Sequence, residues 1–79
     1  MSLPSDEDIA AILLELAAER APGKTFCPSE AARRLAKDWR PLMPDIRRVA
    51  AALPLVATQK GRPVDPLTTK GPIRLARQL

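Results

Sequence analysis

The chain of 79 residues has no histidine, no tyrosine, a single cysteine and three glycines. Without histidine it lacks both the Ser–His–acid arrangement of many hydrolases and the imidazole ligands of many metal sites. Cys27 has no partner for an intramolecular disulfide or a zinc cluster, and we expect it to fill space beside Phe26. No glycine-rich phosphate loop is present. These absences predict a protein that is not an enzyme, with no catalytic residue, cofactor or metal site.

Long apolar runs are missing as well. No run approaches the roughly 20 residues that a membrane span needs, and the first apolar stretch follows acids instead of the bases of a secretory signal. A lone cysteine also suits a reducing compartment. We therefore expect a cytoplasmic protein that does not associate with a membrane.

A chain of this length can fill one hydrophobic core. We predict a single domain over residues 5–76, with terminal tails at 1–4 and 77–79. A homodimer would bury further apolar surface, although no feature of the sequence demonstrates one.

The charges that are present divide unevenly along the chain. Residues 1–30 carry six acids against two bases, whereas residues 31–79 carry three acids against eleven bases. An imbalance of this size in a small domain indicates a polyanionic partner, most often nucleic acid.

Three helices are predicted. Ser5 and Asp8 form a capping box ahead of the first, whose buried stripe is Ile9, Ile12, Leu13 and Leu16, and Pro22-Gly23 ends it. Ser29 is expected to cap a second helix that ends at Ala36, with Ala32, Leu35 and Ala36 as its apolar face. Asp38 can cap a single turn, and Pro44 suits the first turn of a third helix over residues 44–53. That helix should bury Ile46, Val49, Ala50 and Leu53.

Extended segments separate and follow the helices. Residues 24–27 form a short one with Phe26 pointing inward. Residues 55–59 alternate apolar and polar positions as a half-buried strand does, residues 60–63 form a turn, and residues 64–72 are irregular. Residues 73–75 alternate again and can return antiparallel beside residues 55–59. The predicted class is mainly α with a small β-hairpin, in the order of a winged helix-turn-helix.

In such a fold the third helix enters the major groove of DNA and the hairpin, or wing, follows the phosphates. We therefore predict a non-enzymatic domain that binds double-stranded DNA, of the kind that serves as a small transcriptional regulator. The third helix has no Asn, Gln, Ser or Thr to read base edges, so loose or shape-led binding is expected. The predicted contact residues are Arg40, Arg47, Arg48, Lys60, Arg62 and Lys70.

Simpler interpretations exist for each of these groups. Arg33, Arg34 and Lys37 suit an ordinary solvated face, and Lys60 and Arg62 could serve solubility alone. Trp39 is expected to bridge the second and third helices, although it could stack on a base or a partner peptide. A protein-interaction module of the same fold, with Trp39 and the wing against an acidic partner, is the alternative function.

Several motifs support a resemblance over residues 5–76. They are CPSEAA at 27–32, DWRPLMP at 38–44, TQKGRPVDP at 58–66 and KGPIR at 70–74. Together they resemble a family of small bacterial domains of unknown function, which implies a winged-helix fold but no activity, cofactor or catalytic residue. Its shared surface would comprise Trp39, Arg40, Pro44, Gln59, Lys60, Gly61, Arg62, Pro63 and Asp65. Related sequences have a longer turn where this chain has only Leu53-Pro54-Leu55.

Within the TQKGRPVDP motif, Gly61 permits a positive φ. Asp65 can accept hydrogen bonds from loop amides or pair with Arg62 or Arg74.

Overall fold

The first helix, α1 (Asp6–Glu19), begins at the predicted capping box in this computed structural model, which describes residues 3–78. The Ser5 hydroxyl accepts from the Asp8 amide at 3.1 Å, and the Asp8 carboxylate accepts from the Ser5 amide at 3.2 Å. Ile9, Leu13 and Leu16 are buried as predicted, while Ile12 is only half-buried. Each fully buried leucine of this stripe contributes about 1.5–3 kcal/mol of hydrophobic stabilisation.

The second helix, α2 (Pro28–Leu35), starts one residue earlier than a Ser29 cap requires. Cys27 occupies the N-cap position, and its amide donates to the Glu30 carboxylate at 2.9 Å. Ser29 lies inside the helix, so the predicted cap was wrong. Proline is favoured in the first turn because its missing N–H would have no partner there, and this preference places the start at Pro28. The buried face is formed by Ala31 and Ala32, with Leu35 half-buried.

The connection to the third helix contains a short 3₁₀ turn, η1 (Arg40–Leu42). Trp39, and not Asp38, precedes it, so the predicted Asp38 cap was also wrong. Helix α3 (Met43–Ala51) then continues directly and buries Ile46, Val49 and Ala50. It ends two residues short of the prediction, and Leu53 lies half-buried beyond its last turn.

Three antiparallel strands follow, in the spatial order β2-β1-β3. They are β1 (Leu55–Gln59), β2 (Arg62–Pro63) and β3 (Arg74–Arg77). The predicted turn over residues 60–63 is shorter than expected: Lys60 and Gly61 alone turn the chain, both with positive φ (52° and 80°), as a two-residue hairpin requires. Arg62 and Pro63 already pair with Gln59 and Thr58. Residues 64–72 have no strand or helix, as predicted, but β3 begins at Arg74, one residue after the predicted start at residue 73.

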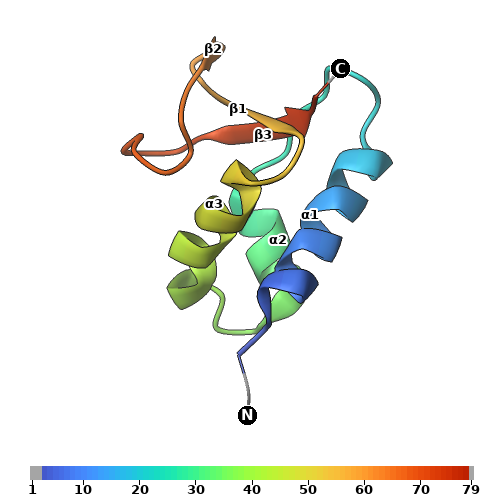
Figure 1. Ribbon diagram of the computed structural model, residues 1–79, viewed down its shortest axis with the longest axis vertical. Helices are drawn as coiled ribbons and strands as arrows, with labels where there is room; N and C mark the ends of the chain where they lie inside the picture. The colour runs from blue at the N-terminus through green and yellow to red at the C-terminus, as the bar shows by residue number, and fades with distance from the viewer. Residues whose placement is uncertain (1–2, 79) are drawn as a thin grey trace.

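Phe26 joins the helices to the sheet. It is fully buried and pairs with Leu75, each amide donating to the other's carbonyl at 2.8 Å. The inward direction and extended backbone of this segment were both predicted correctly. In Figure 1 the three helices lie together on one side of the sheet, and α1 and α3 are on opposite flanks of the view.

The result is an α+β domain whose core lies between the three helices and the inner face of the sheet. Every buried side chain of residues 3–78 is apolar. No helix in the part of the chain that the structure describes is long and apolar enough to cross a membrane.

Candidate functional site

The six residues predicted to contact DNA occupy three separate parts of the domain. Arg40 opens η1, Arg47 and Arg48 lie on α3, and Lys60, Arg62 and Lys70 lie in the hairpin turn, in β2 and in the β2–β3 loop. Their surroundings differ, and the differences decide which of them present a free charge.

Arg48 is held by acids of its own chain. Its guanidinium makes two 2.8 Å hydrogen bonds to the Asp6 carboxylate and a third contact of 3.3 Å to Asp45. The hydrogen bonds lower the pKa of Asp6 and raise that of Arg48, since each stabilises the charged form of its partner. The bidentate pair joins the start of α1 to α3 and offsets the Arg48 charge.

Arg47 is held by backbone carbonyls. Its NH1 donates to the Thr69 carbonyl at 2.6 Å, and its NH2 donates to the Gly71 carbonyl at 2.5 Å. Both acceptors belong to the β2–β3 loop, so this loop lies against α3 where the sequence predicted a surface open to DNA. Arg47 is half-buried as a result.

Arg40 lies beside the only tryptophan. The guanidinium carbon of Arg40 and that of Arg33 each lie 4.8 Å from the centroid of the Trp39 ring, within the range of a cation–π interaction. Trp39 itself is half-buried and packs against the core, as the bridging prediction requires. No acid of residues 3–78 lies within ion-pair distance of either arginine.

Lys60, Arg62 and Lys70 form what we call the hairpin surface. All three are exposed, and their side chains make no ion pair or hydrogen bond with any described residue. The nearest acid in sequence, Asp65, accepts from the Leu67 amide at 2.8 Å, as predicted for a loop-shaping role. The expected pairing of Asp65 with Arg62 or Arg74 is not formed.

Ion pairs elsewhere concentrate on the helices. Arg34 is bidentate to Glu19 at 2.8 and 2.9 Å, and Arg20 lies 2.7 Å from Glu30. Residues 1–54 contain eight acids and eight bases, whereas residues 55–79 contain five bases and one acid. The whole net charge of +4 therefore belongs to the sheet and its loops.

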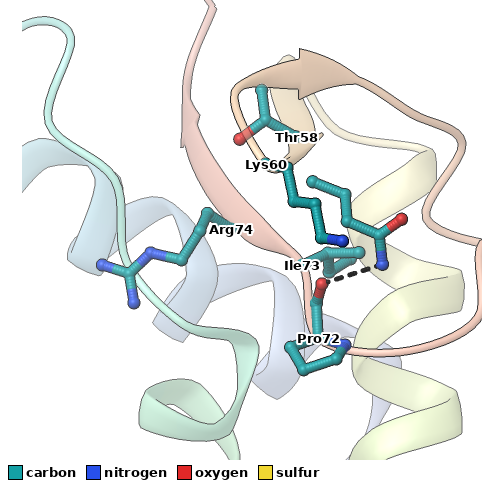
Figure 2. Close-up of a pocket in the computed structure, with 6 residues that line it drawn as sticks. Thr58, Lys60, Pro72, Ile73 and Arg74 are labelled. Atoms are coloured by element: carbon teal, nitrogen blue, oxygen red, sulfur yellow. Dashed lines mark hydrogen bonds between the residues drawn. The ribbon is translucent and has the colours of Figure 1, made fainter.

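A hollow of about 280 Å³ opens beside the hairpin turn, lined by Thr58, Gln59, Lys60, Pro72, Ile73 and Arg74. Figure 2 shows the Lys60 side chain extending across it towards Ile73, while Arg74 extends away from it. The Arg74 guanidinium donates to the hydroxyl and the carbonyl of Thr25 at 3.0 and 3.1 Å. Lys60 is therefore the cation that faces this hollow.

Gln59 has a role that the sequence did not reveal. Its Nε2 donates to the Lys70 carbonyl at 2.8 Å and to the Pro72 carbonyl at 3.1 Å, the second of which is dashed in Figure 2. A polar residue at the end of a half-buried strand was the only signal, and that position alone does not identify a partner eleven residues away.

No group of three His, Cys, Asp or Glu side chains among residues 3–78 is arranged to hold a metal ion. Cys27 is half-buried and accepts from the Ser29 hydroxyl at 3.0 Å.

No curated protein matches this sequence. A family described as "Protein of unknown function (DUF3253)" matches residues 6–78, which include every helix and strand described above. The chain therefore belongs to the DUF3253 family, whose function is not known.

Proposed function

We propose that this domain is a winged helix that binds double-stranded DNA mainly through the phosphate backbone, with weak sequence specificity. The observation that carries this function is the concentration of the net positive charge on the sheet and its loops, where Lys60, Arg62 and Lys70 have no acidic partner among residues 3–78. Such cations gain free energy when they displace the counterions condensed on DNA.

The order of elements supports the winged-helix assignment. Two helices, α2 and α3, follow the extended residue Phe26, and an antiparallel hairpin comes directly after α3. The Phe26–Leu75 bridge gives the sheet a short additional edge beside β3. The hairpin and the β2–β3 loop would then be the wing.

Weak specificity follows from the hydrogen bonds that the arginines of α3 already make within the protein. Direct reading of base edges needs free amide, hydroxyl or guanidinium groups on the helix in the groove. Arg47 already donates to two loop carbonyls and Arg48 to two carboxylates. We therefore assign the phosphate contacts to the hairpin surface, with Arg40 as a further contact beside Trp39, and no base-reading role to α3.

The test is a salt titration of binding to a random-sequence duplex, followed by fluorescence anisotropy. Three to four phosphate contacts predict that log K falls with log salt with a slope of about −3. A dissociation constant no tighter than about 1 mM at about 50 mM salt would contradict DNA binding, because this electrostatic attraction is strongest at low salt.

The alternative is a protein-interaction module that binds an acidic partner. The observation in its favour is the pair of arginines on Trp39, since an aromatic ring flanked by cations suits a carboxylate-rich peptide. An acidic peptide that binds with a change in Trp39 fluorescence, in the absence of DNA binding, would favour this alternative.

A further inference from the structure

The backbone on either side of Lys70 is held by side-chain hydrogen bonds. Four consecutive carbonyls, those of residues 69–72, accept hydrogen bonds alternately from two side chains. Arg47 binds the first and third of these carbonyls, and Gln59 binds the second and fourth. We call Arg47 and Gln59 the clamp, and residues 69–72 the clamped segment.

The two clamp residues reach the segment from different elements. Arg47 projects from α3, and Gln59 ends β1. The clamped segment is therefore tied to the helical layer and to the sheet at once. Its neighbouring residues are ordered by their own backbone, because the Asp65 carbonyl accepts from the Thr69 amide at 3.0 Å.

Gly71 shows how closely the clamp fits. Its φ of +89° favours glycine, and a Cβ at this position would lie 3.2 Å from the Gln59 Nε2. Side chains larger than hydrogen would therefore press on the group that makes the clamp's hydrogen bonds.

The acceptors in the clamp are neutral, so the Arg47 charge is retained beside Lys70. A planar guanidinium can donate to two carbonyls at once, which an ammonium group cannot do with the same fixed geometry. Arg47 thus combines a rigid attachment with a positive charge that no acid of the described chain offsets.

We propose that Arg47 and Gln59 are positioning residues, which hold the β2–β3 loop so that Lys70 meets a phosphate without first being ordered. Arg47 makes no contact with DNA. This inference rests on the proposed DNA binding. A loop that is already ordered loses less conformational entropy on association, and this raises affinity without adding any contact.

The first experiment measures the clamp without DNA. Backbone order parameters from ¹⁵N relaxation at Lys70 and Gly71 should be about 0.85 in the native protein and below about 0.6 in Arg47→Ala and Gln59→Ala. The amide of Ala57, in the middle of β1, is the internal reference and should not change. Order parameters at Lys70 and Gly71 that stay high in both variants would overturn the inference, whatever the protein binds.

The second experiment is a double-mutant cycle on duplex affinity at about 100 mM salt. Lys70→Ala should weaken binding about fivefold in the native background, as expected for one lost phosphate contact. In the Arg47→Ala background the same change should weaken binding less than about twofold. Arg62 is the control, because it lies outside the clamped segment, and Arg62→Ala should have the same effect in both backgrounds.

The variant Arg47→Lys separates positioning from direct contact. It keeps the charge but loses the forked donor, so we expect it to reduce the Lys70 effect as Arg47→Ala does. Native affinity and an undiminished Lys70 effect in Arg47→Lys would overturn positioning and support contact by charge alone. If Arg47→Ala does not fold, the cycle with Gln59→Ala gives the same comparison.

Failure of the function and failure of the clamp give different results. If neither Lys70→Ala nor Arg62→Ala changes affinity in the native background, the proposed binding surface is wrong. If both weaken binding and the Lys70 effect is undiminished by Arg47→Ala, the function stands and the clamp inference is wrong.

Discussion

At the scale of single residues, the two arginines of α3 show how tertiary partners change the role of a side chain. Both were predicted from the sequence to contact DNA. Arg47 instead bonds carbonyls 22 and 24 residues away, and Arg48 bonds a carboxylate 42 residues away. Neither partner follows from the helical pattern, since that pattern reports only the face of a residue and not what lies against it.

Glycine substitutions test the packing around the clamp. Gly61→Ala should destabilise the protein by about 1 kcal/mol, because the backbone is left-handed there although the space is open. Gly71→Ala should cost about 2 kcal/mol, since the new Cβ also presses on Gln59. Urea unfolding at pH 7 measures both. Equal effects of the two substitutions would mean that Gln59 moves aside without loss.

Two serines provide a matched test of helix capping. Ser5→Ala should destabilise the protein by about 1 kcal/mol, because the Ser5 hydroxyl accepts from the Asp8 amide. Ser29→Ala should have a smaller effect, because Ser29 lies inside α2 and bonds only the Cys27 sulfur. Thermal unfolding compares the two variants, and a larger loss for Ser29→Ala would restore the cap position predicted from the sequence.

At the scale of elements, the structural features that were predicted correctly from the sequence are those that depend on local signals. The capping box at Ser5, the strand over residues 55–59 and the inward Phe26 depend on local features, and all were confirmed, although burial along β1 does not alternate. Helix ends shifted where two signals compete: Pro28 overrides Ser29 at the start of α2, and α3 begins one residue before Pro44. The attachment of the β2–β3 loop to α3 could not be predicted, because it depends on contacts between elements.

The attachment of α1 to α3 should depend on pH through Asp6. Its folded pKa lies below the usual value of 3.8, so the pair with Arg48 stabilises the fold above that value. This contribution should be lost as the pH falls below 3.8 through the lowered folded pKa. Both side chains are exposed, so we expect a small effect that salt weakens further.

Thermal unfolding of the native protein and of Asp6→Asn between about pH 6 and pH 2 measures this contribution. The difference in Tm should be constant at the upper end and should shrink below pH 3.8. Glu7→Asn is the control, because Glu7 makes no ion pair with any other residue from 3 to 78. A Tm difference for Asp6→Asn that is unchanged at low pH would show that the carboxylate charge is not its source.

At the scale of the whole molecule, folding redistributes the charge asymmetry of the sequence. The acids of α1 and α2 pair with Arg20, Arg34 and Arg48, and residues 1–54 carry as many bases as acids. The excess remains on the sheet and its loops, above α3 in Figure 1. An anionic partner should therefore meet the hairpin surface first.

Two pairs of lysines test this claim most directly, since they change the net charge equally at different places. Lys60→Ala/Lys70→Ala removes two cations of the hairpin surface, and Lys24→Ala/Lys37→Ala removes two exposed cations of residues 1–54, where acids and bases balance. The measurement is the salt dependence of binding to a random duplex. We predict that the first pair reduces the slope of log K against log salt by about 2 and the second leaves it nearly unchanged. Equal slopes for the two double variants would contradict a DNA-binding surface on the hairpin.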